Sequence, residues 1–276
     1  MSGAPPVRLL VSDIDGTLVT PDKQLTPAAI EAVAGLGRCG LPFTVISSRP
    51  ARGMASVISR LAVSLPFAAF NGANIVAANG DLIEARRLDP AVAARALALL
   101  TRCGIGVWVF ADGDWLVLDL AGPELERERQ TVGFDPKLVT GFESVLDRID
   151  KIVGVSDDDA RLGAAEAQLC GALAASANIE RSQTYYLDIT HPEANKGVAV
   201  RTLCAMLGVD LAETAVIGDM TNDIAMFKVA GFSVVMGQSP PRVKAAADVV
   251  SRANTEDGFA YAVERFIVPR IATGAS

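Results

Sequence analysis

The sequence predicts an α/β protein whose doubly wound, mainly parallel sheet carries an inserted α+β domain. Short apolar runs alternate with helical stretches at both ends of the chain, and the middle of the chain instead shows hairpin signals. The length of 276 residues suits two domains of about 150 residues each. We expect residues 1–81 and 189–276 to form the core domain and residues 82–188 the inserted domain.

The first 70 residues alternate strand and helix. Val7–Ser12 is an apolar run that ends at Asp13, as expected of a parallel strand covered on both faces. Thr26 and Pro27 form an N-cap and first-turn proline, so they open a helix over Ala28–Leu36. The same patterns predict a strand over Phe43–Ile46, a helix over Ala51–Arg60 and a third strand over Phe67–Phe70.

The middle block has a different pattern. Two alternating runs, Gly106–Phe110 and Trp115–Asp119, flank a turn at residues 111–114 and therefore predict an antiparallel hairpin. Further elements expected here are a strand over Lys151–Val155, a helix over Ala160–Ala175, and an antiparallel pair of Ile179–Arg181 with Tyr185–Ile189. After Pro192 the α/β alternation returns, with helices over Gly197–Leu207 and Asp223–Val229 and strands over Thr214–Ile217 and Ser233–Met236.

Composition excludes several classes of protein. A net charge of −7 and a sequence pI near 4.9 argue against a general nucleic-acid binder. No apolar run approaches the length of about 20 residues that spans a bilayer, so we expect no membrane partner. The four cysteines are scattered singly, which favours buried free thiols in a reducing cytoplasm. No feature of the sequence indicates an oligomeric state.

The strongest chemical signal is Asp13-Ile14-Asp15-Gly16-Thr17, directly after the first strand. At the carboxyl end of a parallel strand, both carboxylates would face the crevice where open α/β sheets bind ligands. Two such charges about 4 Å apart repel each other by about 4 kcal/mol at an effective dielectric of about 20, so a hard cation such as Mg²⁺ is the natural partner. An Asx turn that closes the strand is the alternative reading of the same residues.

Three weaker signals follow other predicted elements. Asp219 and Asp223 come directly after the strand that ends at Ile217, although Asp223 alone could be a helix N-cap. Ser47 and Ser48 follow the second strand and could bind an anion or cap the next helix. Lys196 stands just ahead of a helix, where a lysine is most often a solvated surface residue.

Together these motifs resemble the haloacid dehalogenase superfamily of phosphohydrolases, and the resemblance covers nearly the whole chain. The segments Phe70–Ala73, Asp188–Gly197 and Gly218–Phe227 look like the Cof-type sugar-phosphatase branch, in which a cap domain is inserted between the second and third motifs. One departure is Ser47-Ser48-Arg49, where the branch commonly has Thr-Gly-Arg. Ser48 thus replaces a glycine and makes the phosphate-binding backbone less open.

The resemblance implies that Asp13 is the nucleophile and forms an aspartyl phosphate. Asp15 would protonate the leaving alkoxide and then deprotonate the attacking water. Mg²⁺ would be held by the Asp13 carboxylate, the Asp15 backbone carbonyl and Asp219, with Asp223 in direct contact or one layer out.

The same resemblance assigns the phosphate oxygens to Ser47, Ser48 and Lys196, with Asn222 orienting Lys196 or the phosphate. It predicts a phosphatase for a small phosphorylated metabolite, such as a sugar phosphate, with substrate choice made by the cap. The cap residues that could contact the substrate are Trp108, Asp112, Trp115, Tyr185 and Tyr186, although most of them are expected to be core residues or cross-strand pairs of the hairpin. His191 is expected to be a hinge residue.

Two other functions fit parts of this pattern. A phosphomutase or phosphotransferase would use the same aspartyl phosphate and differ only in the acceptor. A phospho-accepting receiver module also gathers Asp, Ser or Thr, and Lys at strand ends, although Asp15 and the large insertion argue against it.

Overall fold

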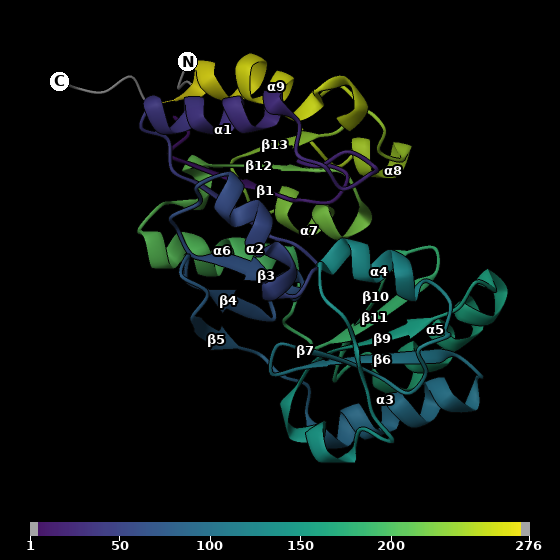
Figure 1. Ribbon diagram of the computed structural model, residues 1–276. Coiled ribbons are helices and arrows are strands. Elements are labelled where there is room, and N and C mark those ends of the chain that lie inside the picture. The colour runs from purple at the N-terminus through teal and green to yellow at the C-terminus, as the bar shows by residue number, and fades with distance from the viewer. Residues whose placement is uncertain (1–4, 272–276) are drawn as a thin grey trace.

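The structure of the protein is a computed structural model that describes residues 5–271. Two parts of the chain form separate layers, one built around a parallel sheet and the other around a mostly antiparallel sheet (Figure 1). In the view of Figure 1 the first part, which contains both ends of the chain, lies above the second. The α/β core with a separate β-rich cap sheet therefore confirms the predicted fold class.

The core sheet has five parallel strands in the order β14-β13-β12-β1-β2. Its strands are β1 (Leu9–Ser12), β2 (Phe43–Val45), β12 (Thr214–Gly218), β13 (Phe232–Val235) and β14 (Val249–Val250). Every residue of β1 is buried because helices cover both faces of the sheet. This placement of β1 between β2 and β12 brings the loops after the three strands to one edge.

Helices sandwich this sheet. α1 (Pro27–Arg38) and α9 (Gly258–Ala262) lie together on one face, and α6 (Lys196–Leu207) and α7 (Ile224–Phe227) lie on the other (Figure 1). The side chain of Thr26 accepts the backbone N–H of Ala29 at 3.1 Å, as its predicted N-cap role requires. The remaining core helices are α2 (Ala51–Arg60) and α8 (Pro241–Lys244).

The third predicted strand does not continue the parallel sheet. A single parallel bridge, Ile46 to Ala68, joins β2 to β3 (Phe67–Ala69). β3 then pairs antiparallel with β4 (Asn74–Val76), and β4 pairs with β5 (Leu82–Ala85). This small sheet was not foreseen, because its strands are too short to show a clear period.

The cap sheet has six strands in the order β10-β11-β9-β6-β7-β8. Their bounds are β6 (Gly106–Ala111), β7 (Asp114–Val117), β8 (Lys137–Leu138), β9 (Ile149–Val155), β10 (Asn178–Gln183) and β11 (Tyr186–Thr190). All pairs are antiparallel except β7 with β8. The predicted hairpin and the pairing of β10 with β11 are confirmed.

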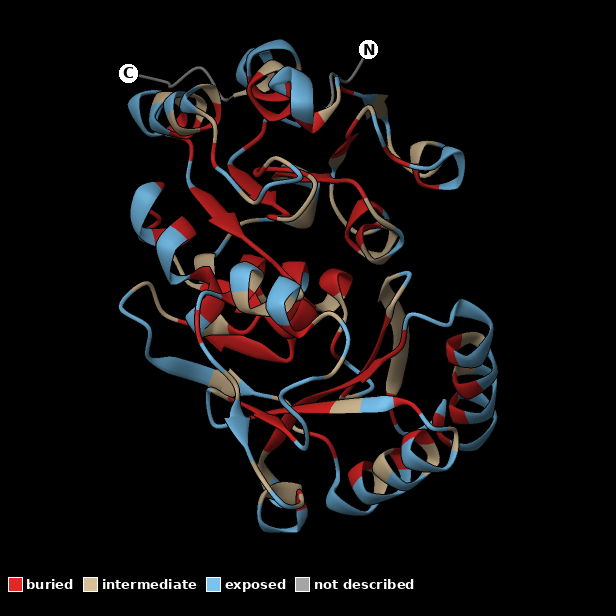
Figure 2. Ribbon diagram, turned by 45° about the vertical axis from the view of Figure 1, so that its right-hand side comes forward, coloured by how far each residue is buried: buried red, intermediate tan, exposed pale blue. Residues whose placement is uncertain are grey.

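Two long helices cover the outer face of the cap sheet. α3 (Pro90–Arg102) and α5 (Asp159–Leu173) pack there, and their outer sides are exposed to solvent (Figure 2). The inner face carries aromatic side chains that belong to the same apolar cluster as the core. The rings of Phe110 in β6 and Phe70 in the core lie 5.5 Å apart, and α4 (Leu125–Val132) approaches α2 across the same boundary. The aromatic face of the cap sheet is therefore turned toward the core.

Several shorter elements connect these layers. They are the 3₁₀ turns η1 (Phe70–Gly72), η2 (Glu143–Arg148), η3 (Leu211–Glu213), η4 (Thr221–Asp223), η5 (Asn254–Glu256) and η7 (Val268–Arg270), and the π-helical turn η6 (Val263–Ile267). The helix predicted over Asp223–Val229 is thus divided between η4 and α7. Within residues 5–271 no helix has the length and apolarity needed to cross a membrane.

All four cysteines are free thiols. Cys204 lies in α6 and is buried in an apolar cluster of the core, but Cys39 and Cys170 are exposed. The expectation of burial is therefore wrong for these two, because Cys39 ends α1 and Cys170 lies on a solvent-facing side of α5.

Candidate active site

The loops that follow three neighbouring strands meet at one edge of the core sheet. Asp13 follows β1, Ser47 lies just beyond β2, and Asp219 follows β12. Because β12, β1 and β2 are adjacent and parallel, their carboxyl ends lie side by side. The backbone N–H of Asp13 donates to the carbonyl of Ile217 at 2.9 Å, which extends the β1–β12 ladder to the site itself.

Three buried carboxylates form the centre of the site. One oxygen from each of Asp13, Asp219 and Asp223 lies within 4.8 Å of the others. Nζ of Lys196 contacts Oδ1 of Asp13 at 2.5 Å and Oδ1 of Asp223 at 2.6 Å. Oδ2 of Asp13 is buried and has no hydrogen-bond partner among the described residues. Lys196 is only 1% exposed, so it belongs to the site and not to the surface.

Burial and neighbouring charges shift the pKa values of the carboxyl groups in this cluster. Burial raises the pKa of Asp13 to about 7, although the ammonium of Lys196 opposes that shift. Burial and the neighbouring carboxylates of Asp13 and Asp223 also raise the pKa of Asp219 well above its ordinary value. One lysine cannot compensate three carboxylates, so the cluster has the excess negative charge of a cation site.

Gly16 allows the Asp13 loop to approach Asp219. Its φ of +83° is readily available only to glycine. A Cβ added at this position would lie 2.2 Å from Oδ2 of Asp219, so a larger residue would displace that carboxylate. Oγ1 of Thr17 donates to Oδ1 of Asp219 at 3.4 Å and fixes the same side chain from the other side.

Asp223 organises the loop around it. Its Oδ2 accepts the backbone N–H groups of Asp219 at 2.7 Å and Met220 at 2.8 Å, and its Oδ1 is occupied by Lys196. Both oxygens are thus engaged within the protein. Asp223 is placed to position Asp219 and Lys196, whereas Asp13 keeps one oxygen without a hydrogen-bond partner among the described residues.

Asp15 is bound by two cations. Nε and Nη2 of Arg49 contact Oδ2 and Oδ1 of Asp15, both at 2.7 Å, and Nζ of Lys23 contacts Oδ1 at 2.7 Å. Burial alone would raise the pKa of Asp15, but the bidentate Arg49 contact and Lys23 outweigh it and hold that pKa below its usual range. In this conformation Asp15 is therefore an ionised carboxylate.

The residues expected at the phosphate differ in their surroundings. Ser47 is fully buried and its Oγ accepts the backbone N–H of Arg49 at 3.2 Å, which leaves its hydroxyl proton available. The carbonyl of Ser48 accepts Nζ of Lys151 at 3.4 Å. Nδ2 of Asn222 donates to Oδ1 of Asn71 at 3.3 Å. Lys196 is oriented by the carboxylates of Asp13 and Asp223. Among the described residues it has no hydrogen bond to Asn222, which was expected to orient it.

A small cavity of about 60 Å³ lies between this site and the cap. Asp15, Ser48 and Arg49 line it from the core, and Trp108, Tyr185 and Tyr186 line it from the cap. Contact of these three cap residues with a substrate stays a prediction. Trp115 is instead fully buried behind Trp108. Asp112 forms ion pairs with Arg87 and Arg148 away from this cavity.

The cap also supplies charged groups to the small cavity. Lys151 pairs with Asp188 at 2.6 Å, and both side chains are buried. Glu128 of α4 lines the same cavity, and burial raises its pKa to about 7. The sequence did not identify four of these charged residues as site candidates, namely Lys23, Arg49, Glu128 and Lys151. Only Arg49 had a signal, since it follows the two serines directly.

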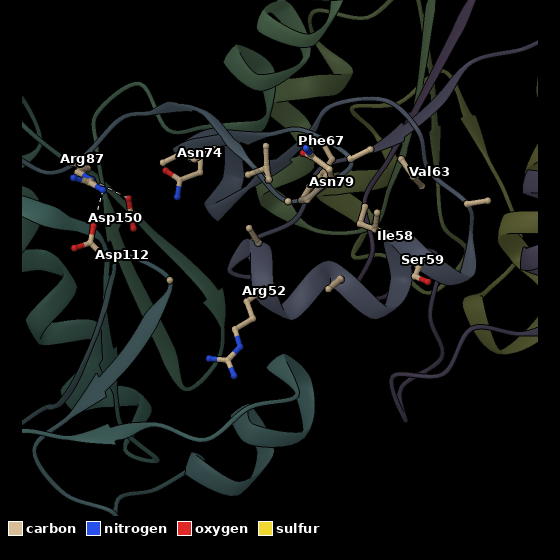
Figure 3. A pocket seen from close by; sticks show the side chains of 18 residues that line it. Arg52, Ile58, Ser59, Val63, Phe67, Asn74, Asn79, Arg87, Asp112 and Asp150 are labelled. Atoms are coloured by element: carbon tan, nitrogen blue, oxygen red, sulfur yellow. Dashed lines mark hydrogen bonds and ion pairs between the residues drawn. The ribbon is translucent and has the colours of Figure 1, made fainter.

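A second, larger cavity of about 840 Å³ lies on another side of α2. Arg87, Asp112 and Asp150 gather at one end of it, whereas Ile58 and Val63 lie at the other (Figure 3). It contains none of the clustered carboxylates at the core-sheet edge. His191, at the return from cap to core, accepts the backbone N–H of Glu193 through Nδ1 at 3.2 Å, and its hinge role stays a prediction.

Comparison with known proteins agrees with this geometry. The profile of a family described as haloacid dehalogenase-like hydrolases matches residues 10–263. A protein named HMP-PP phosphatase from Cronobacter sakazakii is 32% identical over 238 residues, which cover 86% of this chain and 87% of that protein. A haloacid dehalogenase-like hydrolase from Bacteroides thetaiotaomicron superimposes with a TM-score of 0.85 at 25% identity, covering 94% of this chain and 99% of that one. A structure described as a HAD subclass IIB sugar phosphatase superimposes with a TM-score of 0.83 at 23% identity, covering 94% of this chain and 99% of that one.

Proposed function

The chain belongs to the haloacid dehalogenase-like hydrolase family and is a phosphatase. From this premise we propose that it is of the Cof-type branch and hydrolyses a small phosphorylated metabolite with Mg²⁺ through an aspartyl phosphate on Asp13. The substrate class follows the Cronobacter relative, whose name gives HMP-PP as its substrate. A sugar phosphate or a similar phosphomonoester belongs to the same class of small anions.

The donor set at the centre of the site suits Mg²⁺. This ion prefers oxygen ligands and is usually bound by one or two carboxylates together with a substrate phosphate. Oδ2 of Asp13 is buried without a hydrogen-bond partner, and burial and the neighbouring carboxylates raise the pKa of Asp219, so Lys196 alone leaves the cluster short of positive charge. We assign the ligands to Asp13, Asp219 and the backbone carbonyl of Asp15, with Asp223 holding Asp219 in place. Bound there, Mg²⁺ would neutralise charge on the phosphoryl oxygens.

Asp13 is the proposed nucleophile because of the state of its two oxygens. Lys196 engages Oδ1, and Oδ2 is left for attack or for the metal. The attack forms a bond between a carboxylate oxygen and phosphorus and releases the alcohol of the ester. Lys196 and the hydroxyl of Ser47 would bind the non-bridging oxygens, with Ser48 and Asn222 at the edge of that pocket. Positioning and charge neutralisation account for most of the catalysis in such transfers.

Asp15 would serve as the acid and then the base. Asp15 is ionised, which is the state that accepts a proton from water in the second step, but Arg49 and Lys23 oppose that protonation while they contact it. To donate a proton to the leaving alkoxide in the first step, it must first be protonated, which requires these cations to turn away. We propose that the cap, residues 82–188, controls this exchange because it closes over the same cavity.

The observation that carries the proposal is the unpartnered Oδ2 of Asp13 inside a buried carboxylate cluster. The direct test is phosphate release from a panel of phosphorylated metabolites, measured in Mg²⁺ and in EDTA. We expect release only with Mg²⁺, and none from Asp13→Asn with an unchanged circular dichroism spectrum. Asp157→Asn, at an exposed carboxylate, is the matched control. Full turnover by Asp13→Asn would refute the mechanism.

The same assay separates the competing functions. A phosphomutase would give an isomerised phosphate ester in place of free phosphate. Metal binding is measured independently by thermal unfolding, in which Mg²⁺ should raise the Tm of the wild type but not that of Asp219→Ala. Four free thiols, two of them exposed, support a cytoplasmic location as part of this proposal.

A further inference from the structure

The small cavity beside Asp15 adjoins a much larger cleft, with which it shares lining residues. The cleft has a volume of about 1050 Å³ and lies between the loop at residues 21–25, helix α2 and helix α4. Lys23, Arg49, Arg127, Thr131, Gln183 and Tyr185 line both spaces. A substrate whose phosphate reaches Asp13 past Asp15 would therefore extend its leaving group into this cleft.

The walls of the cleft are rich in positive charge. Five basic side chains line it, namely Lys23, Arg49, Arg52, Arg60 and Arg127, and Asp22 is the acidic residue among its described lining. This contrasts with the chain as a whole, which has a net charge of −7. Such a local reversal of sign attracts anions to one place on an otherwise acidic protein.

Not all of this charge is compensated within the protein. Arg127 pairs with Glu124 at 2.7 Å, and Lys23 and Arg49 share the single carboxylate of Asp15. Arg52 forms no ion pair with any carboxylate in residues 5–271. Arg60, farther along α2, also has none in that part of the chain. Positive charge remains in excess even when the carboxyl of nearby Glu128 is counted.

Two of the guanidinium groups are held in place by aromatic rings. Cζ of Arg52 lies 4.3 Å from the ring centroid of Phe134, and Cζ of Arg127 lies 4.7 Å from that of Tyr185. Stacking on an aromatic face leaves the N–H donors at the guanidinium edge open to an anion, except that Nη1 of Arg127 also contacts Glu124. Arg52, Ser56 and Arg60 also recur every four residues on α2, so they form one stripe along the wall.

From these observations we propose that the cleft binds a second anionic group on the leaving part of the substrate, through Arg52 and Arg127. The enzyme then prefers phosphomonoesters whose alcohol carries a further phosphate or carboxylate. This inference rests on the proposed phosphatase function, but it concerns the cleft and not the reacting groups. Arg52 and Arg127 are substrate-binding residues here and take no part in the phosphoryl transfer.

The test uses matched pairs of substrates. Fructose 1,6-bisphosphate is compared with fructose 6-phosphate, and 3-phosphoglycerate with glycerol 3-phosphate, so that a phosphate and a carboxylate are tested separately. We expect kcat/KM to favour the doubly anionic member of at least one pair by roughly tenfold, mainly through KM. The preference should weaken as ionic strength rises from about 0.05 M to about 0.5 M.

Substitution of the two arginines decides the assignment. In Arg52→Gln combined with Arg127→Gln, the ratio of kcat/KM within a pair should fall to about one. Arg102→Gln combined with Arg265→Gln removes the same charge from exposed positions outside the cleft and should retain the ratio. A ratio near one in the wild type, or a ratio unchanged in the cleft variant, would overturn the inference.

Calorimetric binding distinguishes failure of this inference from failure of the proposed function. The same four compounds are titrated with Mg²⁺ into Asp13→Asn protein, with and without the two cleft substitutions. Tighter binding of the doubly anionic compounds that disappears in the cleft variant supports the anion site, even when no compound is hydrolysed by the wild type. Equal binding within both pairs rejects the anion site while leaving hydrolysis to stand on its own assay.

Discussion

Replacing Lys196 by methionine tests the charge balance of the carboxylate cluster. The lysine is buried, and it contacts Asp13 at 2.5 Å and Asp223 at 2.6 Å, with these two side chains 5% and 0% exposed. Removing one partner of a buried ion pair leaves the other charge uncompensated and costs about 3–5 kcal/mol. Methionine has a similar length, so the loss comes from charge and not from a large cavity.

The expected loss is large on a thermal scale. For a protein of this size, 1 kcal/mol corresponds to roughly 2–4 °C in Tm, so Lys196→Met should lower Tm by about 10 °C in EDTA. Lys137→Met is the matched control, since Lys137 pairs with Asp114 at the same 2.6 Å but is 61% exposed. An exposed pair contributes about 0–1 kcal/mol, so this control should shift Tm by only a few degrees.

The assay is thermal unfolding at about pH 8, with EDTA or with saturating Mg²⁺, followed by phosphate release. Mg²⁺ should recover part of the lost stability, because it supplies the counter-charge that the lysine provided. Activity should remain absent, since Lys196 is also proposed to bind phosphate. Equal shifts for Lys196→Met and Lys137→Met in EDTA would refute the reasoning that burial makes this pair important.

Three further predictions concern other contacts. Gly16→Ala should lower Tm and abolish the Mg²⁺-induced rise in Tm, because its Cβ would lie 2.2 Å from Oδ2 of Asp219 at a φ of +83°; an undiminished Mg²⁺ response would contradict this. Burial raises the pKa of Glu128 from 4.5 to about 7, so the folded protein favours the protonated carboxyl. The free energy of unfolding therefore falls as pH rises from about 4.5 through 7. Glu128→Gln should therefore gain in urea midpoint relative to the wild type between about pH 5 and pH 8, and a pH-independent difference would count against the shift. Phe110→Ala should destabilise by about 3–5 kcal/mol in urea unfolding, because its buried ring lies 5.5 Å from Phe70 across the cap boundary; a loss below about 1 kcal/mol would indicate that the two layers do not depend on this contact.

The elements that the sequence predicted well are those with a local cause. The apolar run before Asp13 became β1, and Thr26 with Pro27 opened α1 as expected. The hairpin followed from two alternating runs around a turn. Two of the elements that were missed lack such a cause: β8 has two residues, and α4 is a polar helix whose only buried residues are Leu125 and Val132. The helix α3 was also missed, although Asp89 caps it and Pro90 lies in its first turn.

The residues of the candidate site also differ in whether a local sequence pattern marks them. Asp13 and Asp219 were found because a carboxylate directly after a buried strand is visible in the sequence, and the register of parallel strands then brings them together. Lys196 was a weak candidate because nothing around it in the chain indicates burial. Lys23 and Lys151 act through contacts with residues on other segments, so no local pattern marks them, whereas Arg49 had only its place directly after the two serines as a signal.

The sequence by itself determined which strands would be buried and which carboxylates would stand at their ends, because both depend on a few neighbouring residues. Only the tertiary structure decided the charge state of those groups. Whether Asp15 is ionised depends on Arg49 and Lys23, and whether Lys196 is buried depends on the packing of α6 against the sheet. The large basic cleft is likewise formed only when α2 and α4 meet, because electrostatic interactions depend on distances in space and not on separation along the chain.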